Sequence, residues 1–363
     1  MSIRALQLAS VVLLFHNWLS ATQDAPKVAP LPNDPLELAT GPAVVPNTPE
    51  KRMALLDLLE RARQNSAMHA PGMAPFSLKA SFNAIGKDPH NSGYGEIEET
   101  WLNGQTWRWT ARLGDYSQLR IFYQGTVYDD KPRGHIPLRI QMVRNAVFWP
   151  VVGNFASSLL RMATAKWEGT DLACILISGM MNEATDTPGR RWEENEYCID
   201  PKSGLLRIHS EAPGIYSVFD YDGGIHFHGR VLPRRTTIVE SGTTVLQITL
   251  DNLEDANNDP NQFIPTKKMM SQGPGAVMVG PFRFPDSARS PAGYSGMIQP
   301  VIVHAILDQK GKVLDAEVVQ SPDPTLAAAA LDIVWHRSYL PAQNRDRSLQ
   351  REAFINVRFI PAS

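Results

Sequence analysis

The sequence predicts an α+β protein made mainly of antiparallel strands, with a large curved sheet or open barrel, a helical insert and then a small β-β-α-β domain. Apolar and polar residues alternate over residues 107–113, which is the period of a strand with one buried face. The dipeptide Asn103-Gly104 before that strand is typical of a hairpin turn. Near the C-terminus, two strand-like runs joined by a turn at 308–311 precede a helix and a last strand.

The composition is that of an ordinary globular protein. Of the 363 residues, 43% are hydrophobic and 20% are charged, which excludes a disordered chain, and the length fits two or three domains. The formal net charge is -2 and no basic stripe is present, so no nucleic-acid partner is expected.

Residues 1–21 have the layout of a secretory signal peptide, with Arg4, an apolar run and then the small residues Ser20 and Ala21. We expect cleavage after Ala21 and a location in the periplasm or cell envelope. An uncleaved inner-membrane anchor is the alternative, although the apolar run is shorter than the roughly 20 residues of a membrane span. Residues 22–49 are rich in proline, which predicts an extended tether.

The chain has two cysteines, and both lie in strand-like segments. Cys174 and Cys198 are separated by a polar turn region, so adjacent antiparallel strands would bring them within bridging range. We predict a disulfide between them in an oxidising compartment. Two buried free thiols are the alternative, and no redox or zinc spacing is present.

Residues 50–265 are expected to form the curved antiparallel domain. A helix should open it, because Thr48 can cap the helix and Pro49 fits its first turn. The apolar stripe of this helix consists of Leu55, Leu58, Leu59 and Ala62. Strands are predicted near 76–83, 92–101, 107–113, 119–123, 172–179, 193–199, 204–209, 215–221, 225–231, 235–241 and 243–250.

Two further segments complete the predicted organisation. A helical insert is expected over 137–165, and residues 266–296 are expected to be a linker because they are rich in Gly, Pro and Ser without sustained periodicity. Residues 297–363 form the last domain, with Asp323 and Pro324 at the start of its helix.

This C-terminal stretch resembles the TonB C-terminal domain family in an ordered set of short motifs. These are a D-x-x-G-K-V hairpin, a Ser-x-x-Pro turn, an A-A-L helix that ends in Trp, an aromatic-x-Pro-Ala segment and a final Val-x-Phe strand. The matching residues are Asp308, Gly311, Lys312, Val313, Ser321, Pro324, Ala329, Ala330, Leu331, Trp335, Tyr339, Pro341, Ala342, Val357 and Phe359.

The resemblance implies a small sheet whose edge strand binds an extended peptide of an outer-membrane transporter. Our candidate for that edge is the final strand, residues 353–360. A typical TonB has a membrane anchor and a longer Pro-rich spacer that runs directly to this domain, whereas here a whole β domain intervenes.

The middle region resembles, more weakly, the periplasmic lipoprotein-carrier fold (LolA/LolB-like). The likeness lies in the order of elements: a leading helix, hairpins with Glu and Trp over 95–109, a helical insert, and late strands over 233–253. It implies that the inner face of the sheet holds an acyl chain, and a filled, ligand-free core is the alternative. Alternation alone predicts that Trp101, Trp107 and Trp109 fill the core.

A metal site has one weak candidate. His226 and His228 form an H-x-H pair on a predicted strand, and both would point to the same side of it. Such a pair needs a third converging ligand to hold a metal, and two exposed histidines are the alternative.

Nothing else in the sequence predicts an enzyme. No hydrolase, zinc-protease or phosphate-loop motif is present. Glu96 and Glu98, and likewise Glu193, Glu194 and Glu196, are expected to lie on solvated faces of strands. No catalytic residue and no cofactor are therefore predicted.

The sequence favours an exported, non-enzymatic envelope protein whose C-terminal module docks to an outer-membrane transporter or helps to energise it. A periplasmic carrier of lipid or lipoprotein is the alternative, and a metal-dependent enzyme is the least favoured hypothesis. The expected partner is a transporter peptide or another envelope protein bound by strand addition, with lipid as a further candidate ligand; the oligomeric state is left open.

Overall fold

The computed structural model describes residues 42–70, 72–86, 91–131, 136–153, 155–178, 190–257, 259–274, 281–294, 300–321, 323–340 and 350–360. The predicted signal peptide, the tether up to residue 41 and the motif residues Pro341 and Ala342 lie outside the described residues. None of the described helices has both the length and the apolar character needed to cross a membrane.

The helices are α1 (Pro49–Ser66), α2 (Leu138–Phe148), the 3-10 helix η3 (Pro260–Phe263) and α3 (Pro324–His336). The strands of the first half are β1 (Phe76–Ala84), β2 (Gly93–Asn103), β3 (Thr106–Leu113), β4 (Tyr116–Tyr123), β5 (Thr126–Asp129), β6 (Leu159–Trp167), β7 (Thr170–Ser178), β8 (Asn195–Ile199) and β9 (Leu206–Ala212). The later strands are β10 (Ile215–Asp220), β11 (Ile225–Phe227), β12 (Arg230–Leu232), β13 (Arg235–Glu240), β14 (Thr243–Asp255), β15 (Met270–Pro274), β16 (Phe282–Arg289), β17 (Val301–Asp308), β18 (Val313–Gln320) and β19 (Gln350–Ile360).

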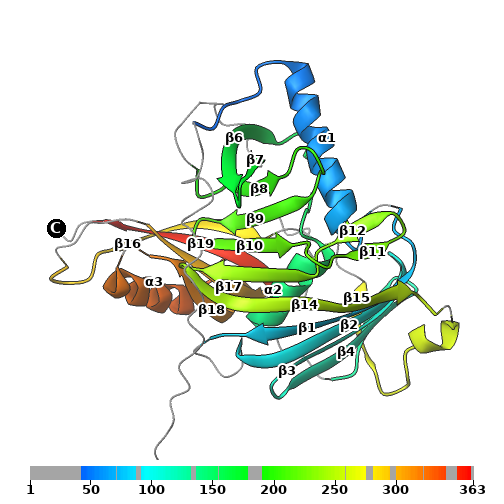
Figure 1. Ribbon diagram of the computed structural model, residues 1–363. Helices are drawn as coiled ribbons and strands as arrows, with labels where there is room; N and C mark the ends of the chain where they lie inside the picture. The colour runs from blue at the N-terminus through cyan, green and yellow to red at the C-terminus, as the bar shows by residue number, and fades with distance from the viewer. Residues whose placement is uncertain are drawn as a thin grey trace, which may run out of the picture. The chain divides into compact units, whose positions relative to one another are not determined.

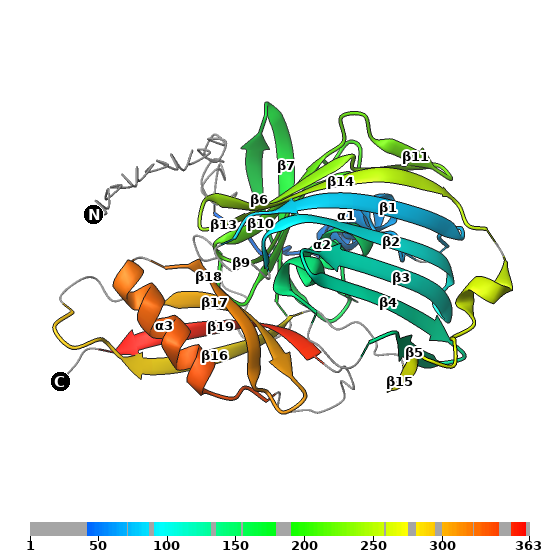
Figure 2. The same cartoon turned by 90° about the horizontal axis from the view of Figure 1, so that it is seen from below.

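The predicted large antiparallel sheet is confirmed, and it is open. Its 13 strands follow the order β15-β5-β4-β3-β2-β1-β14-β13-β10-β9-β8-β7-β6, so its first and last strands do not pair. Figures 1 and 2 show the sheet curving around α1 and α2, and we call the face that these helices cover the inner face.

Helix α1 forms as the sequence predicts. The Thr48 side chain accepts a hydrogen bond from the backbone N–H of Lys51, which satisfies a donor that the first helical turn leaves free. Its predicted apolar stripe is buried against the part of the inner face formed by β6 to β10, in a core with Ile175, Ile199 and Phe219.

The predicted helical insert over 137–165 is only partly correct. The helix ends at Phe148, and residues 159–167 form β6, which pairs with β7 along its whole length. The burial of β6 alternates, which is the period of a strand and not of a helix.

Two further predictions need correction. The expected single strand at 225–231 is a two-stranded hairpin, because His228 and Gly229 take positive φ values of 45° and 77° and reverse the chain. Segment 266–296, expected to be a linker without periodic structure, contains β15 and β16. Strand β15 pairs with β5, and β16 pairs with β19.

The C-terminal region has the predicted β-β-α-β order, with β16 added. Its four-stranded sheet follows the order β16-β19-β17-β18, and β16 pairs with β19 in parallel. Asp323 caps α3 by accepting from the backbone N–H groups of Thr325 and Leu326. One face of this sheet packs under α3. The other face contributes Ile306 and Phe354, among others, to the core that α2 shares with the large sheet.

Candidate functional site

The predicted disulfide is confirmed. Cys174 on β7 lies directly opposite Cys198 on β8, with their Cα atoms 3.9 Å apart. Both residues are fully buried. The bridge therefore joins neighbouring strands of the large sheet, as the spacing of the two segments predicts.

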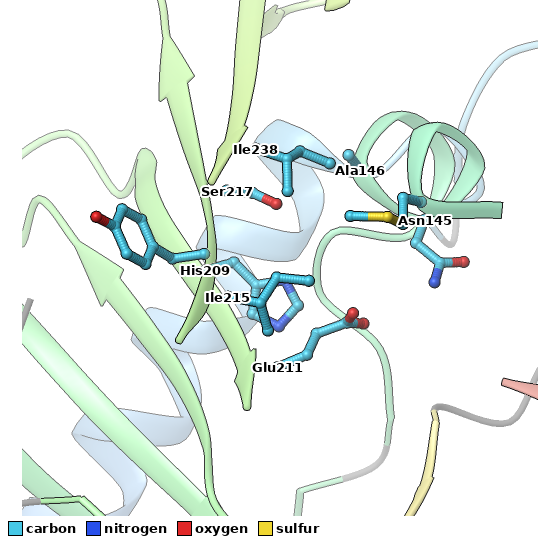
Figure 3. A pocket seen from close by; sticks show the side chains of 9 residues that line it. Asn145, Ala146, His209, Glu211, Ile215, Ser217 and Ile238 are labelled. Carbon is cyan, nitrogen blue, oxygen red and sulfur yellow. The ribbon is translucent and has the colours of Figure 1, made fainter. Parts of the chain in front are cut away.

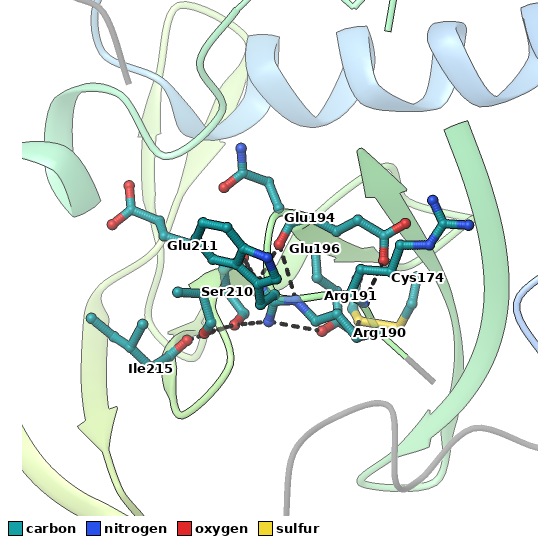
Figure 4. A network of polar contacts seen from close by, with 12 residues as sticks. Cys174, Arg190, Arg191, Glu194, Glu196, Ser210, Glu211 and Ile215 are labelled. Atoms are coloured by element: carbon teal, nitrogen blue, oxygen red, sulfur yellow. Dashed lines mark hydrogen bonds and ion pairs between the residues drawn. A yellow bond between two sulfur atoms is a disulfide. The ribbon is translucent and has the colours of Figure 1, made fainter. Parts of the chain in front are cut away.

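The glutamates next to this bridge are not solvated, contrary to the prediction. Glu194 and Glu196 are buried. Arg161 on β6 donates to both carboxylate oxygens of Glu194 at 2.8 and 2.7 Å, and an Arg190 nitrogen lies 3.5 Å from Glu196 (Figure 4). Arg161, the main partner of Glu194, lies 33 residues away in sequence, so local alternation could not identify it. This network is structural, because its charges neutralise one another within the protein.

The weak metal candidate is not supported. His228 lies in the turn after β11, where its Nε2 is 2.6 Å from Asp255 Oδ1, and both His226 and His228 are exposed. Among the residues that the structure describes, the group with metal-binding spacing is Cys174, Glu196 and Cys198. Its two sulfur atoms already form the disulfide.

The C-terminal motif residues hold the turn and the core of their own sheet. Asp308 Oδ1 accepts from the N–H groups of Lys310 and Lys312, which closes the turn before β18. A Cβ at Gly311 would lie 2.3 Å from the Tyr339 carbonyl oxygen, so only glycine fits there. The other described motif positions differ in burial. Val313, Ala330, Tyr339, Val357 and Phe359 are buried, Ser321, Ala329 and Leu331 are partly buried, and Pro324 and Trp335 are exposed.

The predicted edge strand is wrong. Residues 353–360 belong to β19, which is paired on one side with β17 and on the other with β16. The chain thus covers this edge itself, with a strand from the segment that was expected to be a linker. Strand β16 carries Pro285, a residue typical of protected sheet edges because it lacks an N–H donor.

Helix α2 lies where the inner face meets the C-terminal sheet, and acidic residues of that sheet hold it. Pro137 at its N-cap offers no side-chain cap. Asp315 on β18 accepts instead from the N–H of Leu138 at 3.2 Å, and Glu352 on β19 accepts from Asn145 at 2.6 Å. A carboxylate at a helix N-terminus also interacts favourably with the helix dipole.

Arg139 ties α2 to both sheets. Its guanidinium donates to Glu240 on β13 at 3.0 Å and to Glu317 on β18. His304 on β17 extends the cluster, with its Nε2 2.7 Å from Glu352 Oε1 and its Nδ1 3.8 Å from Glu240 Oε1. We call these five residues the interface charge cluster.

Burial and mutual contact shift the pKa values of this cluster. Burial alone would lower the pKa of His304, but hydrogen bonding to Glu240 and Glu352 outweighs it and raises the pKa to about 10. Burial would raise the pKa of Glu240, but His304 and Arg139 hold it below its usual range. For Glu317, burial prevails over the opposing Arg139 and raises the pKa to about 7.

A small cavity lies beside α2 on the inner face (Figure 3). Its volume is about 20 Å³, room for about one water molecule. Burial raises the pKa of Glu211, which lines it, to about 8, with the charge of Glu352 adding to the effect. Burial also lowers the pKa of His209 to about 3, so this imidazole is neutral at physiological pH. A second cavity of similar size lies on the other side of Ala146, and neither could hold an acyl chain.

Beyond α2, the inner face of β2 to β5 carries aromatic side chains that the helix covers only in part. Trp101 on β2 faces Trp107 on β3, which faces Phe122 on β4. Trp101, Trp107 and Trp149 are half-buried, whereas Trp109 is fully buried. We call the half-buried group Trp101, Trp107 and Trp149 the aromatic wall.

The next row across the same strands is charged. Glu99, Trp109, Arg120 and Asp129 are direct neighbours on β2 to β5. Glu99 Oε1 is 2.5 Å from His69 Nε2, and Arg120 donates to both Asp129 oxygens at 2.7 and 3.0 Å. Each carboxylate in this row therefore has its own cationic or imidazole partner. The sequence gives little indication of this row, because Glu99 and Arg120 lie in segments that otherwise look like solvated strands.

Comparisons with known proteins give limited information. No protein-family model matches the sequence, and no curated protein matches it either. Among solved structures, a LolA-superfamily protein from Nitrosomonas europaea aligns with a TM-score of 0.39 and 10% identity, over 58% of this chain and 97% of that one. A putative outer-membrane lipoprotein-sorting protein domain from Vibrio parahaemolyticus aligns with a TM-score of 0.38 and 8% identity, over 57% and 95%. The first carries the LolA name of the family that the middle region was expected to resemble, and the second is named for lipoprotein sorting, but scores this low establish neither a shared fold nor a shared activity.

Proposed function

We propose that the protein is a non-enzymatic lipid-binding protein or lipid carrier of the cell envelope, and that the inner face of its large sheet binds an acyl chain. The observation that carries the proposal is the aromatic wall, an apolar surface that α2 leaves partly uncovered on the inner face of an open sheet. Aromatic side chains provide large apolar area for a flexible chain to cover. The buried disulfide supports an oxidising compartment such as the periplasm.

The acyl chain would lie along the aromatic wall, since the two cavities beside α2 are too small for it. The test is to purify the full-length protein from its exported fraction and to identify bound lipid by mass spectrometry. Binding is then measured as quenching of tryptophan fluorescence by a brominated fatty acid. Trp107→Ala should weaken binding about tenfold, because it removes apolar contact area from the centre of the wall.

The matched control is Trp335→Ala, since Trp335 is exposed on α3 in the C-terminal region. This variant should bind the lipid as the wild type does. Protein that is purified without lipid and shows no quenching would overturn the proposal. Quenching that disappears in Trp335→Ala but persists in Trp107→Ala would place the lipid on the C-terminal region instead.

Docking to an outer-membrane transporter peptide is a second candidate function. The described part of the C-terminal region exposes the large apolar side chains of Trp335, Leu340 and Ile360, which a partner could cover. Because β19 is paired on both sides, a peptide would have to add to the outer edge of β16 or of β18, or displace β16. Calorimetric titration of the full chain with transporter peptides tests this candidate, and the absence of binding for all of them would remove it.

A further inference from the structure

Arg144 on α2 is a buried cation without an ionic partner in the described part of the chain. Its side chain is 8% exposed, and its Nε has no hydrogen-bond acceptor. Its guanidinium carbon lies 4.9 Å from the ring centre of Trp109 and 5.2 Å from that of Trp149. These contacts hold the flat guanidinium group in place without neutralising its charge.

The neighbouring carboxylates are already engaged. Glu99 contacts His69 and Asp129 pairs with Arg120, so neither carboxylate forms an ion pair with Arg144, although both attract its charge while Arg120 repels it. Burial lowers the pKa of Arg144 to about 10, so the group still carries its charge at physiological pH. A buried charge without a partner is costly, and natural proteins tolerate such a cost mainly at functional sites.

We propose that Arg144 binds the anionic head group of the ligand, and that this ligand is a fatty acid whose carboxylate accepts hydrogen bonds from the guanidinium. The inference rests on the proposed function and names its ligand class. A planar carboxylate matches the fork of guanidinium donors, and one monoanion would form the ion pair that Arg144 lacks among the described residues. The aromatic wall, which shares Trp149 with the Arg144 contacts, lies where the apolar tail would follow.

The test compares a fatty acid with a neutral analogue of the same length. Decanoate and 1-decanol are titrated calorimetrically into the wild type, into Arg144→Met and into the control Arg112→Met, which removes an exposed arginine of β3. Inorganic phosphate is added separately as an anion without a tail, with thermal unfolding as the readout. A charge-assisted contact predicts at least about tenfold tighter binding of decanoate than of decanol by the wild type and by Arg112→Met.

Arg144→Met should bind both compounds equally and should unfold at the same temperature as the wild type or higher, because it removes an unpaired buried charge at nearly constant volume. Equal binding of both compounds by the wild type would overturn the role of Arg144 while leaving the proposed function intact. If neither compound binds but phosphate stabilises the wild type and not Arg144→Met, the anion site stands and the lipid function fails. If no ligand has any effect on the wild type, both are overturned.

Discussion

Arg161 and Glu194 form an ion pair that is almost completely removed from water, with side chains 0% and 1% exposed. Replacing Arg161 by Met leaves the Glu194 carboxylate buried beside an apolar group. We expect Arg161→Met to lower the free energy of unfolding by about 3–5 kcal/mol, measured by urea denaturation. The control is the exposed pair of Arg235 and Asp220, where Arg235→Ala should cost less than about 1 kcal/mol. Equal losses in the two variants would contradict the prediction.

Single residues were predicted best where their partner lies on the neighbouring strand. The disulfide was predictable because Cys174 and Cys198 lie in consecutive strand-like segments. Glu194 was placed in solvent because its partner, Arg161, lies on β6, a strand inside the expected helical insert. Nothing in the sequence indicated that Arg144 is buried, since an arginine on an amphipathic helix ordinarily points to water.

At the scale of elements, the turn between β9 and β10 packs tightly on β18. Gly214 in this turn has a φ of 85°, and a Cβ there would lie 2.2 Å from the Val319 carbonyl oxygen. Gly214→Ala should therefore lower the free energy of unfolding by more than the backbone strain at a positive φ would do alone. The control is Gly242→Ala, at a φ of 72° with open space around it, which should cost about 1–2 kcal/mol.

We expect Gly214→Ala to be less stable than Gly242→Ala by at least about 1 kcal/mol, because the added methyl group forces the turn away from β18. Chemical denaturation of the two variants provides the measurement. If the two variants have the same free energy of unfolding, the contact between the turn and β18 contributes nothing to stability.

Helices α1 and α3 were predictable because local capping residues, Thr48 and Asp323, define their starts. Strands β6 and β16 were missed for a different reason. Segment 159–167 follows a genuine helix, and β16 contains a proline in a stretch without sustained periodicity. The position of β16 beside β19 depends on tertiary contacts, including those of Arg283 with Trp192 and Asn195, which no local pattern encodes.

At the scale of the whole molecule, the large sheet and the C-terminal sheet share one core and one set of buried charges. Ile306 and Phe354 of the C-terminal sheet pack in the same core as the residues of α2. Asp315 and Glu352 reach α2 from two strands of that sheet. The composition of residues 266–296 predicted a linker, and with it a separable docking module. The shared core could not be foreseen, because its contacts join segments more than a hundred residues apart.

This shared interface should make stability depend on pH. The pKa values of His304, Glu211 and Glu317 are raised in the folded protein to about 10, 8 and 7, from 6.5 for His and 4.5 for Glu. The folded state therefore holds these protons more tightly than the unfolded state, and the stability they provide is lost as pH rises. The lowered pKa of His209 makes stability rise with pH, because the unfolded state binds this proton more tightly. That effect is confined to pH values below 6.5, the usual pKa of histidine.

Between pH 6.5 and 9 we therefore expect the free energy of unfolding to fall by more than about 1 kcal/mol, followed by urea denaturation in buffers of equal ionic strength. Glu211→Gln should flatten this dependence, because its side chain stays neutral while the buried carboxyl of the wild type must ionise beside Glu352. Glu98→Gln removes an exposed carboxylate of β2 and should leave the slope as in the wild type. If the free energy of unfolding of the wild type rises over this range, the raised pKa values of His304, Glu211 and Glu317 do not control the pH dependence of stability.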